Sequence, residues 1–247
     1  MKRQRADSAS TSPTSLPVPM QTLSGRVVLV AGAGSGIGRA TAVMCAERGA
    51  KVAVADLLLP AALETQQLLS SANPATESEA IGVDVADEAS VTAMINAVIS
   101  RFGRLDCALN AAGIEGDRAP LHVSSVDNFD KVLAVNLRGA YLCMRAEIAQ
   151  MLKQQAADQT VSSSASQAPI DMLNYSIVNV SSSAGQAGMP EFSAYSASKH
   201  GINGLTRSAA KEYASKGIRV NALCPSTTDT PMVARFAERW PEWQVLV

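Results

Sequence analysis

Short apolar runs recur along the chain and alternate with segments whose apolar residues have helical spacing. An uninterrupted apolar run is typical of a parallel strand that is covered on both faces, whereas a helix repeats its apolar residues every three or four positions. For example, Ile37, Ala40 and Met44 share one helical face in a segment that ends at Gly49. The pattern predicts strands over residues 27–30, 51–55, 80–83, 105–109, 176–180 and 219–223, and helices that include 129–152 and 193–215.

A glycine-rich turn joins the first predicted strand to the first predicted helix. Glycine lets the backbone approach a pyrophosphate, and the free N–H groups at a helix start point toward it. The glycines have the spacing Gly-x-x-x-Gly-x-Gly, not Gly-x-Gly-x-x-Gly. We therefore predict a dinucleotide phosphate site at Gly32, Gly34, Ser35, Gly36, Ile37 and Gly38.

Asp56 ends the second predicted strand, close to where dinucleotide-binding folds place an acid on the adenosine ribose. A carboxylate accepts hydrogen bonds from the 2′- and 3′-hydroxyls and repels a 2′-phosphate. Leu57 follows, and no lysine or arginine comes soon after it, so this position favours NAD over NADP. The competing interpretation is that Asp56 caps the next helix.

Tyr195 and Lys199 lie four positions apart on a predicted helix and therefore share one helical face. An ammonium beside a phenol favours the phenolate, which would let Tyr195 exchange protons closer to neutral pH. Ser182, just after the fifth predicted strand, would bring a hydroxyl to the same place. Alone, this spacing is most often a surface lysine over a half-buried tyrosine.

With these motifs in this order, the chain resembles the short-chain dehydrogenases/reductases over about residues 25–232. Asp84 and Val85 match the adenine-contacting pair of the family, and Asn136 matches its active-site asparagine. Taken singly, Asn110 would be a turn residue and Asn136 a polar residue on a helix surface. The remaining matches are the turn that supports the sheet (Asn110, Ala111 and Gly113), the catalytic Ser182, Tyr195 and Lys199, and the cofactor-closing loop (Pro225, Thr228 and Thr230).

The resemblance implies one α/β domain over residues 25–247, a Rossmann-type doubly wound parallel sheet with helices on both faces. The implied reaction is reversible hydride transfer between NAD(P) and a secondary alcohol or ketone. Tyr195 would exchange the substrate proton, and Lys199 would lower the pKa of Tyr195 and bind the nicotinamide ribose. Ser182 would hold the substrate oxygen, and Asn136 would anchor a water relay.

The resemblance also implies a homodimer or homotetramer that pairs through the predicted helices 129–152 and 193–215. We expect these helices to offer apolar side chains to the partner, among them Leu142, Met144, Ile148 and Leu205.

Composition agrees with one globular domain, since 47% of the 247 residues are apolar and 17% are charged. A net charge of −1 gives no basis for binding nucleic acid or an anionic membrane, and no apolar run approaches the length of a membrane span. The four cysteines and two histidines lack metal-site spacing. We expect buried thiols in a reducing compartment and no metal.

Residues 1–24 are rich in Ser, Thr and Pro, carry Lys2, Arg3 and Arg5, and contain no apolar signal region. We expect a disordered tail. The cytoplasm is the expected location, with a short mitochondrial transit peptide as the alternative.

Two segments depart from the family pattern. Residues 154–170 lengthen the chain between Asn136 and Ser182, and their linker-like composition predicts a surface loop. After Pro225 we expect neither the usual substrate-covering helix nor a final strand, and no family counterpart for residues 240–247. The catalytic residues are all present but these parts are expected to be missing. Two alternatives to an active enzyme therefore stay open: a catalytically impaired truncated form and a non-enzymatic NAD-binding protein.

Overall fold

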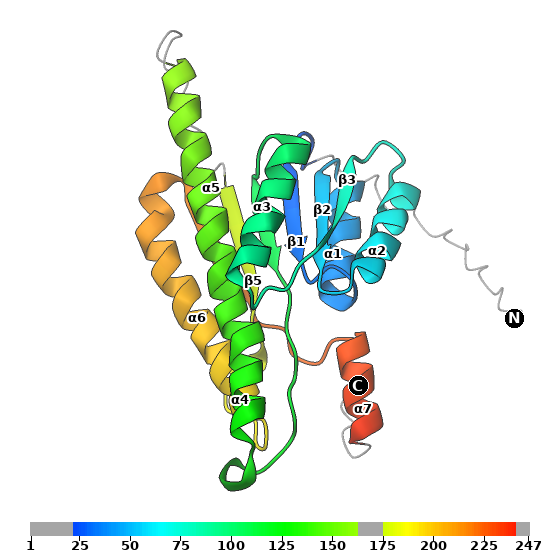
Figure 1. The fold of residues 1–247 in the computed structure, drawn as a ribbon, viewed down its shortest axis with the longest axis vertical. Coiled ribbons are helices and arrows are strands. Elements are labelled where there is room, and N and C mark those ends of the chain that lie inside the picture. The colour runs from blue at the N-terminus through cyan, green and yellow to red at the C-terminus, as the bar shows by residue number, and fades with distance from the viewer. Residues whose placement is uncertain (1–21, 163–174, 241–247) are drawn as a thin grey trace, which may run out of the picture.

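Six parallel strands form one sheet with the order β3-β2-β1-β4-β5-β6 (Figure 1). The computed structural model describes residues 22–162 and 175–240, so most of the expected N-terminal tail, residues 163–174 and residues 241–247 lie outside it. All six predicted strands are present. They are β1 Val27–Ala31, β2 Lys51–Asp56, β3 Ser78–Gly82, β4 Cys107–Asn110, β5 Tyr175–Val180 and β6 Ile218–Leu223.

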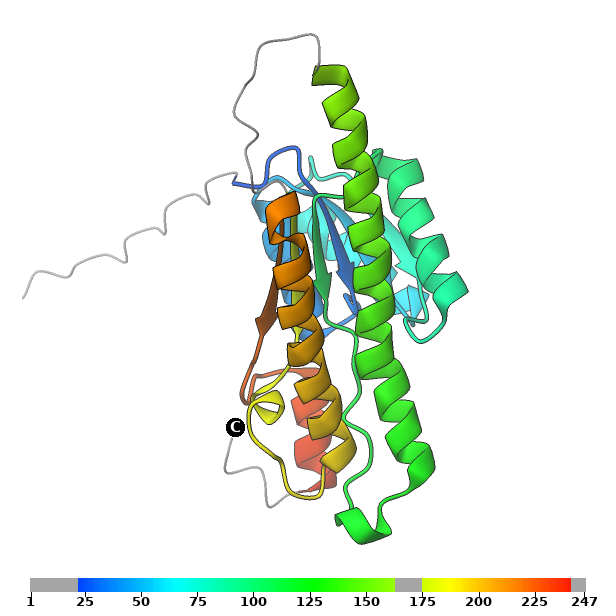
Figure 2. The same ribbon diagram turned by 90° about the vertical axis from the view of Figure 1, so that its left-hand side faces the viewer.

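Helices cover both faces of the sheet, as expected for a doubly wound fold. Side chains alternate along each strand, so Leu29 faces one helical layer and Val30 the other. Helices α3 (Glu88–Phe102), α5 (Gly139–Ser162) and α6 (Ser193–Tyr213) pack on the first face, and Figure 2 shows α5 and α6 side by side in front of the sheet. Helices α1 (Gly36–Glu47) and α2 (Leu59–Ala72) cover the second face.

The predicted helix 129–152 is wrong at both ends. It begins as α4 (Val126–Val132), passes through a π-helical stretch at Leu133–Arg138 and continues as α5 to Ser162. The start of the predicted loop 154–170 is therefore helical. The Gln154 amide accepts from the Leu105 N–H and donates to the Leu105 carbonyl, both at 2.9 Å, and these bonds tie α5 to the start of β4.

Three of the four residues expected at a dimer interface are instead buried within the chain itself. Leu142, Met144 and Ile148 are at most 6% exposed and belong to the core between α5 and the sheet. Leu205 on α6 is partly buried against the same core. The error arose because a helix of a doubly wound fold turns its most apolar face toward the sheet.

A helix follows β6, contrary to the expectation that the substrate-covering helix is absent. Helix α7 (Pro231–Arg239) begins after the Thr230 hydroxyl accepts a hydrogen bond from the Val233 N–H at 3.3 Å. Proline at the first helical position favours a start at this residue. None of its residues is fully buried, and it lies beside the carboxyl ends of the strands rather than on a face of the sheet (Figure 1).

Candidate active site

The predicted Ser182, Tyr195 and Lys199 come together where β5 ends against the first turns of α6. The Ser182 hydroxyl follows β5 and accepts a hydrogen bond from the Ala184 N–H at 3.1 Å. Lys199 is 4% exposed, its ammonium donates to the Val180 carbonyl at 2.9 Å, and its Nζ lies 5.5 Å from the centre of the Tyr195 ring. A strand end and one helical face thus hold all three groups.

Burial shifts the pKa values of both Tyr195 and Lys199 toward their neutral forms. Burial raises the pKa of the Tyr195 phenol; its hydrogen bond with Ser182 lowers that pKa, and the charge of Glu115 raises it. Burial also lowers the pKa of Lys199 to about 8. The expectation that Lys199 lowers the pKa of Tyr195 stays a prediction.

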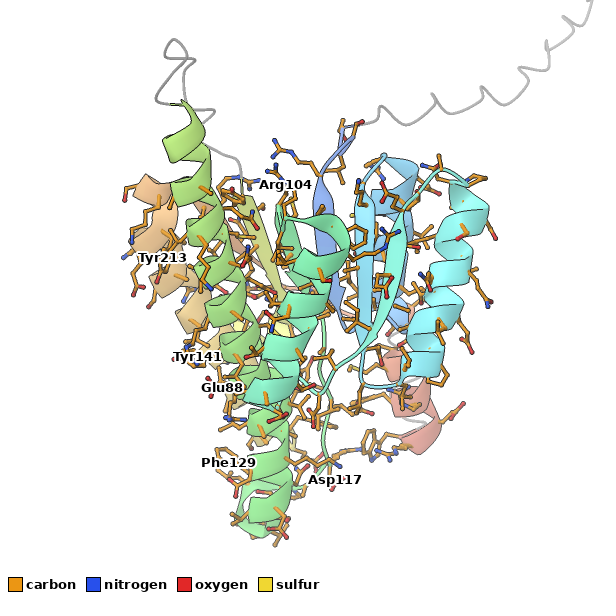
Figure 3. The ribbon with its side chains drawn as sticks, turned by 45° about the horizontal axis from the view of Figure 1, so that its top comes forward. Glu88, Arg104, Asp117, Phe129, Tyr141 and Tyr213 are labelled. Atoms are coloured by element: carbon orange, nitrogen blue, oxygen red, sulfur yellow. The ribbon has the colours of Figure 1, made fainter. Side chains whose placement is uncertain are left out.

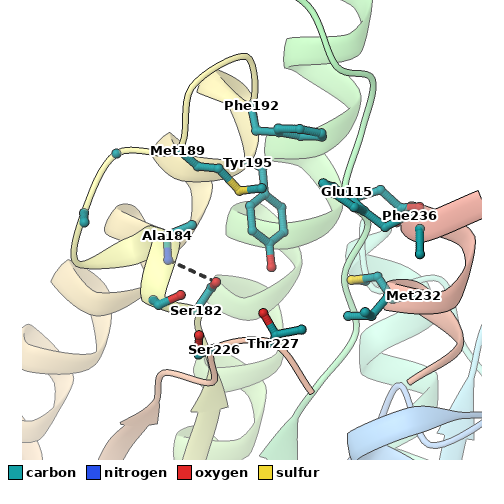
Figure 4. A pocket seen from close by; sticks show the side chains of 15 residues that line it. Glu115, Ser182, Ala184, Met189, Phe192, Tyr195, Ser226, Thr227, Met232 and Phe236 are labelled. Atoms are coloured by element: carbon teal, nitrogen blue, oxygen red, sulfur yellow. Dashed lines mark hydrogen bonds between the residues drawn. The ribbon is translucent and has the colours of Figure 1, made fainter. Parts of the chain in front are cut away.

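A cavity of about 370 Å³ opens beside the Tyr195 hydroxyl and Ser182 (Figure 4). Glu115 is the one carboxylate among its lining residues. The cavity can hold a small, mainly apolar molecule whose oxygen reaches the phenol. The largest apolar side chains of its wall are Met189, Phe192, Met232 and Phe236.

Helix α7 forms part of the cavity wall through Phe236, which packs in an aromatic cluster with the lining residue Phe192 and with Trp240. The Phe192 and Phe236 ring centres are 5.1 Å apart, and those of Phe236 and Trp240 are 4.7 Å apart. Sequence reasoning missed these lining residues. A signal for them was present, because Thr230 and Pro231 form a helix start and the apolar residues that follow have helical spacing.

Asn136 is fully buried, so the interpretation of it as a surface residue is wrong. It lies in the π-helical stretch, a conformation that is frequent at functional sites. Its amide accepts from the Ile114 N–H at 2.8 Å and donates to the Ile114 carbonyl at 2.9 Å and to the Ser198 hydroxyl at 3.1 Å. These bonds fix the loop that carries Glu115. The water relay stays a prediction.

The glycine turn lies between β1 and α1, as predicted. Gly32 has a φ of +85°, and a Cβ there would collide with the backbone of Ala112. The Ser35 side chain makes no capping bond to α1, so the first N–H groups of this helix remain available to an anion. Thr230 lies against Gly36, which brings the loop after β6 over the same turn.

Asp56 reaches the glycine turn, and it does not cap α2. Its carboxylate accepts from the Gly34 N–H at 2.8 Å and from the Leu58 N–H at 3.0 Å, while Leu58 itself precedes α2. The nearby Arg39 guanidinium bonds the Gly34 carbonyl and the Thr65 hydroxyl and pairs with Glu64. The glycine turn and the partly exposed Asp56 carboxylate therefore lie together at the carboxyl ends of β1 and β2, in the crevice where a dinucleotide would bind.

The other predicted cofactor residues divide between the crevice and the core. Asn110 belongs to the core, where its amide bonds Glu147 and Asn179. Asp84 is exposed and its carboxylate accepts from the Ala86 N–H at 2.9 Å, whereas Val85 is buried. Near the crevice the structure places the turn after β4 (Ala111 and Gly113) and the loop after β6 (Pro225, Thr228 and Thr230).

In the described residues, no group of three or more His, Cys, Asp or Glu side chains is arranged to hold a metal ion. None of the described helices is long and apolar enough to cross a membrane.

Comparison with known proteins matches residues 26–240 to the family model for short chain dehydrogenases. The chain is 37% identical over 220 residues to levodione reductase of Leifsonia aquatica. The matched region covers 89% of this chain and 76% of that protein. The chain is 40% identical over 209 residues to cis-4-hydroxycyclohexanecarboxylate dehydrogenase of Sinomonas cyclohexanicum, covering 85% and 76%. The match reaches Trp240, beyond the boundary near residue 232 expected from the motifs.

Solved structures agree. The crystal structure of levodione reductase matches with a TM-score of 0.80 at 37% identity and covers 90% of this chain and 79% of that chain. NAD⁺-bound xylitol dehydrogenase matches with a TM-score of 0.74 at 33% identity, covering 83% and 71%. The 3-ketoacyl-(acyl-carrier-protein) reductase of Brucella melitensis, complexed with NADH, matches with a TM-score of 0.75 at 30% identity, covering 89% and 84%.

Proposed function

Because the chain belongs to the short-chain dehydrogenase family, we propose that it transfers a hydride between NAD(H) and a secondary alcohol or ketone. The observation that carries the proposal is that Ser182 and Tyr195 line one largely apolar cavity, with the Lys199 ammonium 5.5 Å from the centre of the Tyr195 ring. Relatives that act on alcohols or ketones support NAD(P)-dependent oxidoreduction in general.

The residues present fit a dinucleotide. Uncapped N–H groups at the start of α1 suit its pyrophosphate, and the Asp56 carboxylate suits the hydroxyls of its ribose. Two of the similar solved structures hold NAD⁺ or NADH. When bound, the nicotinamide supplies hydride transfer.

In our proposal Tyr195 exchanges the proton of the substrate oxygen, and Ser182 holds that oxygen beside the phenol. Lys199, with a pKa of about 8, is mainly cationic at neutral pH and would bind the nicotinamide ribose. Its charge favours the phenolate whenever Tyr195 gives up its proton. Asn136 would hold the loop at residues 113–115 and anchor a water that connects the site to solvent.

The test compares Tyr195→Phe with Lys199→Ala. Phenylalanine removes only the ionisable oxygen, so turnover should fall below detection while NADH binding stays within about twofold of the unaltered protein. Lys199→Ala should lower both, because the lysine would also bind the ribose. Comparable turnover after Tyr195→Phe would contradict the proposed proton transfer. Tight NADH binding with no turnover of any alcohol or ketone would favour a non-enzymatic protein.

A further inference from the structure

Glu147 is a carboxyl group buried without a charge partner. It lies on α5, is 0% exposed, and belongs to the side of the helix that faces the sheet. No cation or second carboxylate of the described residues contributes to its pKa, which burial raises to about 7. The ionisable neighbour that feels its charge is the Cys143 thiol, one turn earlier on the same helix.

Glu147 begins a chain of buried hydrogen bonds that links α5 to α6 through β4 and β5. The Asn110 amide donates to Glu147 Oε2 at 3.1 Å and to Asn179 Oδ1 at 3.0 Å. The Asn179 amide in turn donates to the Thr206 hydroxyl at 3.0 Å and contacts Met144 Sδ at 3.1 Å. Apart from Glu147 none of these groups titrates near neutral pH, and α3 adds only apolar residues to this core.

Two oxygens of this chain, Glu147 Oε1 and Asn110 Oδ1, are buried with no hydrogen-bond partner among the described residues. Both N–H groups of Asn110 are already used, so its oxygen needs a donor from elsewhere. An ionised Glu147 has no proton to give, and it would leave both acceptors unpaired at a cost. A protonated Glu147 would carry a donor beside Asn110, whose amide already bonds the other oxygen of the same carboxyl.

Asn110 links Glu147 to the turn after β4, which lies at the crevice proposed to bind the cofactor. It is the last residue of β4, and the turn that follows it packs its Ala112 backbone against Gly32. A Cβ added to Gly113 in the same turn would lie 3.5 Å from Lys199 Nζ. A change at Asn110 therefore acts on the glycine turn and on the catalytic lysine together.

We propose that Glu147 is a positioning residue that keeps its proton at neutral pH and donates it in a hydrogen bond to Asn110 Oδ1. The bond holds the turn at residues 110–113 in the shape that receives the dinucleotide. Loss of the proton to solvent at higher pH breaks the bond, puts a charge in the core and weakens dinucleotide binding. The binding part rests on the proposed function, whereas the protonation does not.

Carboxyl ¹³C NMR of the glutamate-labelled protein tests the protonation directly. The Glu147 resonance, identified by its loss in Glu147→Gln, should report a neutral acid at about pH 6, where an ordinary glutamate is ionised. Glutamine has the shape of the protonated acid and its own N–H donor. The Tm of Glu147→Gln should therefore stay near that of the unaltered protein, while Glu147→Ala should lower it.

Linkage gives the sign of the pH dependence. The folded pKa lies above the unfolded one, so the contribution of Glu147 to stability is complete below about pH 4.3 and is lost as pH rises toward about 7. NADH affinity should likewise fall about fivefold between about pH 6 and pH 8. Glu147→Gln should flatten the stability profile and make the fall in NADH affinity smaller, leaving only the part that comes from the loss of the Lys199 charge, whose pKa is about 8. The exposed Glu212→Gln on α6 is the matched control and should keep them.

An ionised Glu147 at about pH 6 would overturn the proposal, as would a Glu147→Gln variant as unstable as Glu147→Ala. Equal pH dependence of NADH affinity in the unaltered protein and in Glu147→Gln would remove the positioning role. Failure to bind NADH at any pH would instead contradict the proposed function. The NMR and unfolding measurements would still decide whether Glu147 carries the proton.

Discussion

At the scale of single residues, the charge of Glu115 bears directly on the phenol of Tyr195, the proposed proton carrier. It raises the pKa of Tyr195, and alcohol oxidation needs the phenolate. Glu115→Gln should lower this pKa and move the low-pH limb of the oxidation rate to lower pH. The pH dependence of kcat/KM measures it, with the exposed Asp117→Asn of the same loop (Figure 3) as the control. An unmoved limb would show that Glu115 does not tune Tyr195.

Asp56 should decide between the two dinucleotides. We expect NADH to bind at least about tenfold more tightly than NADPH, a difference of about 1.4 kcal/mol. Asp56→Asn keeps an oxygen for the Gly34 N–H and removes the negative charge, so the preference should shrink with little loss of NADH affinity. Fluorescence titration measures all four affinities. Equal or tighter NADPH binding by the unaltered protein would contradict the prediction.

At the scale of elements, the sequence located strands better than helices. An apolar run marks a strand because a parallel strand is covered on both faces, and all six were found. Helix ends were less certain. Nothing in the pattern marked the π-helical stretch around Asn136, or the continuation of α5 through polar residues such as Gln154 and Gln155. Those residues bond loops that are distant in sequence, and a local pattern does not show such contacts.

The residues of the candidate site also divide into those that a local sequence pattern predicts and those that only tertiary packing reveals. The proposed proton-transfer residues and the glycine turn follow from spacing within one strand end or one helix, so their positions were predictable. The role of Glu147 was not, because a single glutamate on an amphipathic helix normally faces solvent. Only the packing of α5 on the sheet shows that this carboxyl is buried beside Asn110.

Helix α7 should govern the substrate more than the stability of the fold. Phe236 lines the cavity, so Phe236→Ala removes part of the apolar wall that the substrate would contact, and kcat/KM should fall about tenfold, about 1.4 kcal/mol. NADH affinity and Tm should change little, because no residue of α7 is fully buried. Glu238→Ala on its exposed side is the control. A large fall in Tm would show that α7 is part of the core.

At the scale of the whole molecule, an apolar groove between α4–α5 and α6 supports a homodimer through these helices. Leu133, Leu137 and Leu205 line it, and on α4 and α5 Phe129 and Tyr141 are 41% and 47% exposed (Figure 3). These residues replace the buried Leu142, Met144 and Ile148 in the predicted interface.

We expect light scattering to report a dimer at micromolar concentration. A Cβ at Gly204 would meet open space, so Gly204→Arg should leave the subunit folded and push a partner away. The control is Leu68→Asp on the exposed side of α2, which should remain dimeric. A monodisperse monomer of the unaltered protein would contradict this mode of assembly.

The wholly parallel sheet also has a consequence for how the chain reaches its native state. Among the described residues all five strand pairings are parallel, so none of these strands is joined to its neighbour by a hairpin that could form early. Each pairing must wait until a crossover has closed, and β1 meets β4 only after two intervening strands have been made. High contact order of this kind slows folding, and the partly formed sheets expose unpaired strand edges that can pair between molecules. Yield on refolding from denaturant should therefore fall steeply as protein concentration rises.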